Sequence, residues 1–359
     1  MDIPERAVSI VLLAGLLGIS GGCGGAGEPG DARGPDAAPS LAAPVNDLPN
    51  PYTRIEPWAQ LPEGMTLGAV IGAEPGPDGS LYVLHRCFEN SCAGRPEPPI
   101  LRFDMSGRLL GSWGEGMFVF PHGFHVDDAG NVWTTDTQAQ DGIGQQVLKF
   151  SPEGELLMAL GQAGVAGELP EAFNQPTDVV VAANGDIFVT QGHSSAGDTE
   201  AAHSRVVHFS ADGTFIEAWG TLGSGPGELD RPHTIALDSQ GRLFVGDRSN
   251  NRIQIFDQEG DYLDQWTQFS RPSGIYITGD DTIYVSDSES WGPDNPGWKK
   301  GIRVGSARDG SVRYFIEDIE STTGEHSGAE GVGVDAEGNV YGAVVRRRML
   351  EKHVPGQPG

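Results

Sequence analysis

Two Pro-His pairs stand out among the residues of this chain that could do chemistry. His122 lies in FPHGF and His233 in DRPHT, and each pair opens an apolar run that is followed by a turn and a second strand-like segment, NVWTTD or RLFVGD. Histidine nitrogens bind transition metals and move protons near neutral pH. Whether the two histidines can act together depends on the elements that carry them.

Those elements are copies of one repeat, in which a short apolar run, a turn with Asp or Gly, and a strand rich in Val, Tyr, Phe or Trp precede further strands. This alternation is the signature of hairpins. A spacing of about 40 to 57 residues is typical of a propeller blade. The sequence therefore predicts an all-β fold, a six-bladed β-propeller over residues 51–355 with four-stranded antiparallel blades around a central channel. The six repeats start at Gly68, His122, Thr177, His233, Ser273 and Glu330.

The last repeat contains only three clear strands. We expect residues 52–62 to supply its fourth strand, because such a clasp closes the ring and removes exposed sheet edges.

The first strand of each blade lines the channel, so the residue that starts it faces the axis. His122, His233 and Glu330 fall in the second, fourth and sixth blades, which lie about 120° apart. Two imidazoles and one carboxylate that approach from three sides form a tripod for a divalent metal, with zinc expected first and iron, manganese or cobalt as alternatives. The competing interpretation is that each side chain is a water-bonded polar residue at the channel mouth.

The second strands run antiparallel to the first and end at the same mouth. Arg86 and Arg248 follow the second strands of blades one and four. Two guanidiniums that face an axial metal could clamp a substrate carboxylate. Alternatively, each arginine pairs with an acid at the surface.

The runs RPHTIALDSQGRLFVGDRSNNRIQIFD and QPTDVVVAANGDIFVT resemble NHL repeats. In this order, FPHGF, QPTD, RPHT and GDRSNNRIQ resemble one NHL family in particular, the peptidyl-α-hydroxyglycine α-amidating lyases. The resemblance covers about residues 65–345. It implies a lyase that cleaves the C–N bond of a carbinolamide to an amide and glyoxylate.

The resemblance also implies roles for single residues. Its three zinc-binding positions are all histidines, whereas the third is Glu330 here. It makes Arg86 and Arg248 active-site arginines, and it places His193 where the family has a tyrosine base, so His193 is expected to move the proton. The calcium-binding aspartate of the family is replaced by Gly331, and bound calcium is therefore not expected.

The chain begins with an apolar stretch over residues 7–19, followed by small residues and Cys23. This pattern predicts an export signal over residues 1–23 and resembles a bacterial lipoprotein signal, with lipidation at Cys23. Plain secretion is the alternative. Residues 24–50 are rich in Gly, Pro and Ala and predict a disordered tether. We therefore expect an exported protein of the cell envelope or periplasm that contacts the membrane only through a lipid anchor.

The two other cysteines, Cys87 and Cys92, lie five residues apart. In an exported protein they predict a local disulfide, and a metal site is the weaker interpretation because further ligands at the usual spacing are missing.

The formal charge of −27 argues against a nucleic-acid partner, because it would repel a phosphate backbone. The expected partner is a small-molecule or peptide-derived substrate with a carboxylate, and the oligomeric state stays open. The leading functional hypothesis is a metal-dependent, amidating-lyase-like enzyme. The alternatives are a non-catalytic NHL binding module and a metal-dependent propeller hydrolase, which would need more carboxylates on the axis.

Overall fold

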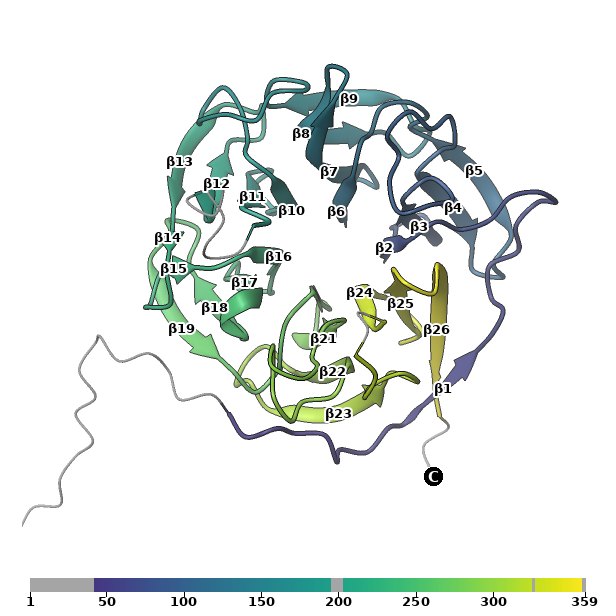
Figure 1. Cartoon of the computed structure of the whole chain (residues 1–359), viewed down its shortest axis with the longest axis vertical. Helices are drawn as coiled ribbons and strands as arrows, with labels where there is room; N and C mark the ends of the chain where they lie inside the picture. Colours follow the sequence, from purple (N-terminus) through teal and green to yellow (C-terminus); the bar gives the residue numbers. More distant parts are fainter. Residues whose placement is uncertain (1–41, 195–202, 325–326, 357–359) are drawn as a thin grey trace, which may run out of the picture. The chain divides into compact units, whose positions relative to one another are not determined.

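The computed structural model describes residues 42–194, 203–324 and 327–356. Six four-stranded antiparallel sheets are arranged around a central axis, which confirms the predicted six-bladed β-propeller (Figure 1). The strands of blades one to three, from the axis outward, are β2 (Val70–Pro75), β3 (Ser80–His85), β4 (Ile100–Asp104), β5 (Leu109–Trp113); β6 (Pro121–Val126), β7 (Val132–Gln140), β8 (Ile143–Phe150), β9 (Leu156–Leu160); and β10 (Pro176–Val181), β11 (Ile187–Gln191), β12 (Arg205–Phe209), β13 (Phe215–Trp219).

Blades four to six follow the same plan, with β16 (Pro232–Leu237), β17 (Leu243–Asp247), β18 (Arg252–Phe256), β19 (Tyr262–Trp266); β20 (Gly274–Ile277), β21 (Thr282–Asp287), β22 (Gly301–Ser306), β23 (Val312–Glu317); and β24 (Ala329–Val334), β25 (Val340–Val344), β26 (Met349–Pro355), β1 (Tyr52–Ile55). A short parallel pair, β14 (Thr221–Leu222) and β15 (Glu228–Leu229), and the 3-10 turn η2 (Arg248–Asn250) complete the described elements.

The ring closes as the sequence predicts. Strand β1 pairs antiparallel with β26, so an N-terminal strand completes the last blade. Just beyond it, the buried Trp58 packs edge-on against Tyr341 of blade six, at 5.3 Å between ring centroids, and against Phe103 of blade one at 5.8 Å. One side chain thus bridges the first and last blades.

Residues 42–50, which the sequence assigns to a tether, run along the outside of blade five. The side chain of Asn46 donates to Gly297 O and accepts from Lys299 N, and the backbone N–H of Phe315 donates to Pro49 O. The buried guanidinium of Arg303 also donates to Val45 O. This part of the predicted tether is therefore bound to the propeller, because its backbone carbonyls accept hydrogen bonds from Arg303 and from strand β23.

The hydrophobic cores lie between neighbouring blades. In one of them, Tyr82 and Ile100 of blade one pack with Val132 and Phe150 of blade two. Alternating strands put apolar side chains on both faces of each sheet, and these faces are buried only when blades stack side by side. The packing therefore fixes the ring and the positions of the inner strands.

The predicted signal, Cys23 and residues 24–41 lie outside the described residues, so export and lipidation stay predictions. Within the described ranges, no helix is long and apolar enough to cross a membrane.

Candidate metal centre

Each inner strand that contributes to the site begins with an irregularity in its pairing. The β16–β17 ladder pairs Pro232 and then Thr234, so His233 is skipped, and the β24–β25 ladder skips Glu330 in the same way. The β6–β7 ladder skips His122 together with the following glycine. A β-bulge of this kind re-aims one side chain out of the ladder. All three side chains line the cavity on the propeller axis.

The strand pairing also shows which residue of blade one is equivalent to His122, His233 and Glu330. The sequence places it at Gly68, but the β2–β3 ladder skips Ile71. The glycine-rich start of this repeat hid the bulge. Blade one therefore presents an apolar side chain at the level where blades two and four present histidines.

The rings of His122 and His233 meet edge to face, with their centroids 4.5 Å apart. Nδ1 of His122 lies 2.8 Å from Thr177 O, and Nδ1 of His233 lies 2.7 Å from Ser273 O. A carbonyl only accepts, so both Nδ1 atoms carry the proton and both Nε2 atoms keep a lone pair. These buried Nε2 atoms have no hydrogen-bond partner among the described residues. Such an outer hydrogen bond is how proteins orient a metal-binding histidine.

The contact between His233 and Glu330 fits a bound cation. Nε2 of His233 lies 3.1 Å from Oε1 of Glu330, although the geometry is not that of a hydrogen bond. A lone pair and a carboxylate oxygen at this distance repel each other unless a proton or a cation lies between them. The donor set therefore fits a divalent metal.

The structure adds a third imidazole that the sequence assigns to proton transfer. The His193 ring lies 4.8 Å from that of His122 and 5.6 Å from that of His233, measured between centroids. One potential ligand atom of each histidine lies within 4.8 Å of the others, and this is the only such group of three in the part of the chain that the structure describes. His193 therefore completes a compact set of three nitrogen ligands, with the carboxylate of Glu330 beside it.

The three imidazoles are neutral near pH 7. Burial, reinforced by the neighbouring His233, holds the pKa of His122 well below its ordinary value, and burial next to His122 does the same for the pKa of His193. Burial and the charge of Arg248 also lower the pKa of His233. Neutral imidazole is the form that binds metal.

Glu330 is held in place from two sides. Ser288 Oγ donates to Oε2 at 2.7 Å, and Arg248 Nη1 lies 3.4 Å from Oε1. Burial alone would raise the pKa of Glu330, but the positive charge of the neighbouring Arg248 helps to hold it well below its ordinary value. The carboxylate therefore stays ionised and oriented. Ser288 was missed from the sequence, although it follows the second strand of its blade just as Arg86 and Arg248 do.

The two arginines are buried but differently held. Arg86 donates from Nε to Pro121 O and from Nη1 to Asn90 Oδ1, and its guanidinium lies 3.6 Å above the Phe120 ring. Burial lowers the pKa of Arg86 to about 10, which still leaves it charged near neutral pH. Arg248 lies 3.4 Å from a carboxylate oxygen of Glu289 as well as of Glu330. Arg248 therefore does pair with acids, but these are Glu289 and Glu330 beside the metal centre and not acids at the surface.

Arg231 is a further residue that the sequence reasoning missed, although it lies in the DRPHT motif. Its backbone has a positive φ of 57°, and its Nε is buried without a hydrogen-bond partner among the described residues. Its charge contributes to the low pKa of His193. Arg231 therefore adds positive charge to the same side of the centre.

The predicted disulfide region lies next to Arg86, and Cys87 and Cys92 are joined in the structure. Of the other histidines, His85 is buried and accepts from Gly68 N through Nδ1, which is a structural role.

Comparison with known proteins supports this picture of the fold. The NHL repeat model matches residues 229–256. The chain is 31% identical over 232 residues to NHL repeat-containing protein 3 of Homo sapiens. The matched region covers 62% of this chain and 62% of that protein. It is 31% identical over 258 residues to peptidyl-glycine alpha-amidating monooxygenase B of Xenopus laevis, which covers 62% of this chain and 28% of that protein.

It is also 33% identical over 178 residues to a probable peptidyl-alpha-hydroxyglycine alpha-amidating lyase of Caenorhabditis elegans, with 48% of this chain and 45% of that protein covered. The chain thus matches less than two thirds of the length of these relatives. Among solved structures, streptogramin B lyase superposes with a TM-score of 0.53 at 17% identity, over 84% of this chain and 96% of that one, which shows the fold alone. The chain is a six-bladed β-propeller in which residues 229–256 match the NHL repeat, and it is similar to proteins named amidating lyases.

Proposed function

We propose that this propeller is a metal-dependent lyase that cleaves the C–N bond of a carbinolamide, R-CO-NH-CH(OH)-COO⁻, to an amide and glyoxylate. The observation that carries the proposal is the group of three neutral imidazoles, two buried and one half-buried, with Glu330 and two arginines beside it. The similarity to proteins named amidating lyases supports the same reaction class.

The proposed metal ligands are His122, His193 and His233, a change from the tripod predicted with Glu330. Three histidine nitrogens are a ligand set typical of catalytic zinc, and iron, manganese or cobalt accept similar donors. A bound divalent ion would supply Lewis acidity at the hydroxyl oxygen of the substrate. The carbonyls of Thr177 and Ser273 keep two of the imidazoles in the correct tautomer.

In this proposal Glu330 moves the proton. Its ionised carboxylate accepts the proton of the substrate hydroxyl, the C–O bond becomes a carbonyl as the C–N bond breaks, and the same proton is returned to the amide nitrogen. No other reactant is consumed, so atoms and charge balance. Ser288 and Arg248 keep the carboxylate oriented through the cycle.

Arg86 and Arg248 are proposed to bind the substrate carboxylate, with Arg231 adding charge beside them. All three guanidiniums lie on the side of the centre reached by the ends of the second strands. In a buried site an ion pair with a carboxylate is stronger and more directional than at the surface.

Two variants separate the roles assigned here. His193→Ala should lower zinc affinity at least about 10-fold, whereas Glu330→Gln should keep near one equivalent of metal and lose turnover of α-hydroxyglycine substrates by about 100-fold or more. Bound metal is measured by elemental mass spectrometry and glyoxylate by its reaction with a hydrazine. Ser288→Ala keeps the histidines and the Glu330 carboxylate but removes a hydrogen bond to that carboxylate. Its turnover should lie between that of the unmodified protein and that of Glu330→Gln.

The reverse pattern, metal lost in Glu330→Gln and kept in His193→Ala, would restore Glu330 as the third ligand. Full metal occupancy without any glyoxylate from the unmodified protein would reject the reaction and leave the metal centre intact.

A further inference from the structure

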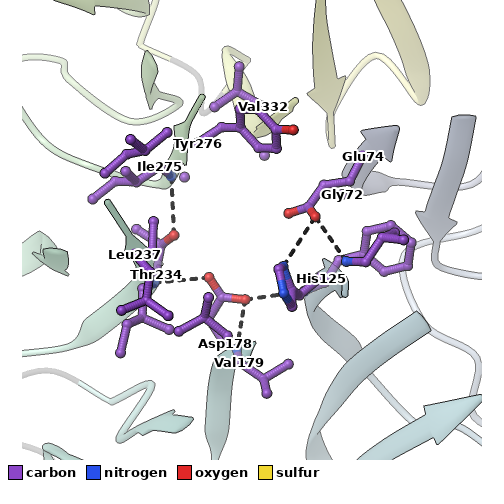
Figure 2. Close-up of a pocket in the computed structure, with 18 of the residues that line it drawn as sticks. Gly72, Glu74, His125, Asp178, Val179, Thr234, Leu237, Ile275, Tyr276 and Val332 are labelled. Carbon is purple, nitrogen blue, oxygen red and sulfur yellow. Dashed lines mark hydrogen bonds and ion pairs between the residues drawn. The ribbon is translucent and has the colours of Figure 1, made fainter. Parts of the chain in front are cut away.

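A cavity of about 760 Å³ extends along the axis from the imidazoles of His122 and His233. All six inner strands line it, from His122, His233 and Glu330 at one end to exposed turn residues such as Asp128 and Gly279 at the other. Figure 2 shows Glu74, His125 and Asp178 around the same hollow as Tyr276 and Val332. The metal centre is therefore reached by an open channel from the face opposite to the arginines.

This channel is strongly acidic. None of the described residues that line it is Lys or Arg. Two of the acids near the mouth pair with cations outside the lining, Asp238 with Arg242 at 2.7 Å and Asp127 with Lys149 at 3.9 Å. The acidic lining residues are Glu74, Asp127, Asp128, Asp178, Asp238, Glu330 and Asp335.

Glu74 and Asp178 lie between the mouth and the imidazoles. One oxygen of Glu74 accepts from Val126 N and lies 3.3 Å from His125 Nδ1. Burial alone would lower the pKa of His125, but its hydrogen bond to Glu74 raises it. Burial raises the pKa of Asp178 to about 7. Even with His125 protonated and Asp178 neutral, the lining keeps a negative charge.

The opposite approach to the centre is positive. Arg86, Arg248 and Arg271 are buried around the imidazoles on that side, and Arg231 lies beside them. Glu289 lies between two of them, since Arg271 Nε and Nη2 both donate to its Oε2 and Arg248 Nη1 lies 3.4 Å from its Oε1. A divalent cation would meet guanidiniums on that side and carboxylates on the channel side.

We propose that the acid-lined channel is the route by which the divalent metal ion reaches the imidazoles, while the anionic substrate approaches from the arginine side. A second observation points to a ligand at its inner end, because the unpartnered Nε2 belongs to His122, a residue only 6% exposed that lines the cavity. A cleft of one charge sign raises the local concentration and the association rate of counter-ions. The route rests on the metal centre of the proposed function but not on its reaction.

The test is the rate at which Co²⁺ binds to the full chain after its metal has been removed with a chelator. Cobalt held by histidines absorbs visible light, so association can be followed by stopped-flow absorbance without any turnover. Glu74→Gln and Asp128→Asn remove acids from the lining, and Gly279→Arg adds a cation at the mouth, where a side chain meets open space. The matched control is Glu153→Gln, in the exposed β8–β9 turn away from the lining.

At about 10 mM salt we expect the association rate constant to fall about 3- to 10-fold in Gly279→Arg and in the combined Glu74→Gln, Asp128→Asn variant, and to stay unchanged in Glu153→Gln. The difference should vanish at about 1 M salt, where the Debye length is only about 3 Å. Because Gly279→Arg removes no contact, it reports on the channel even if Glu74→Gln misfolds.

Unchanged rates in Gly279→Arg, or an equal fall in Glu153→Gln, would overturn the route while leaving the metal centre in place. Failure of the unmodified protein to bind Co²⁺ would overturn the route and the metal centre together.

Discussion

The two ends of the inner strands use the same fold in different ways. At the channel mouth the turns repeat one arrangement, in which an aspartate accepts the backbone N–H two and four residues further on. This holds for Asp127, Asp238 and Asp335. At the other end of the same strands the equivalent residues differ from blade to blade, namely Ile71, His122, Thr177, His233, Ser273 and Glu330.

The recurring residues serve the fold, and the residues that differ between blades serve the site. A residue that recurs in several blades answers a need that each of those blades has, such as closing a hairpin. A residue type confined to some blades answers a need of the whole ring, because the ligands of one axial point have to come from several blades. The aspartates should therefore affect stability, and the histidines should affect binding.

The largest expected effect is the loss of metal from His122→Ala or His233→Ala. Zinc affinity should fall at least about 100-fold, because one of three nitrogen ligands is removed. Isothermal titration calorimetry measures the affinity. His208→Ala is the control, since His208 pairs with Asp186 on blade three.

Since burial keeps the ligand pKa values low, zinc should also remain bound at about pH 6, just below the ordinary histidine pKa. An affinity that follows an ordinary histidine titration would contradict the buried site.

The next effect in size is a loss of stability in Asp335→Ala. Its buried carboxylate accepts from Glu337 N, Asn339 N, Asn339 Nδ2 and Tyr341 Oη, so truncation leaves buried donors without a partner. The free energy of unfolding should fall by about 2 to 3 kcal/mol, with zinc affinity of the folded protein unchanged. Chemical unfolding measures the stability, and titration calorimetry measures the zinc affinity. If Asp335→Ala weakened zinc binding as much as His122→Ala, the division between the two ends would be wrong.

The last effect concerns Asp178, which lies between the two ends. Its pKa is raised to about 7 in the folded state from 3.8, so the folded carboxyl holds a proton that the unfolded one has lost. The stabilising contribution is therefore present at low pH and is lost as the pH rises from about 4 to 7.

Asp178→Asn should remove this dependence, so the stability of the unmodified protein relative to the variant should decrease between about pH 5 and pH 8. Thermal unfolding at both pH values measures it. A constant difference would show that Asp178 remains ionised and belongs with the turn aspartates.

The fold and the pair His122 and His233 could be predicted because both depend on local patterns. Alternation of apolar residues and turn residues repeats along the chain, and the ring position of each Pro-His pair follows from the repeat number alone. Arg86 and Arg248 could be placed at the same mouth for the same reason. The position in blade one was wrong because the bulge register there has no signal in GAVIGAEP.

The remaining features depend on contacts between blades. The place of His193 beside His122, the hydrogen bond from Ser288 to Glu330 and the acid lining of the channel each join residues that are far apart in the sequence. The sequence by itself determined the repeat, the six blades and which residue types face the axis, because these follow from local strand periodicity. Only the tertiary structure decided which of these side chains meet, because that depends on the bulges and on the packing of one blade against the next.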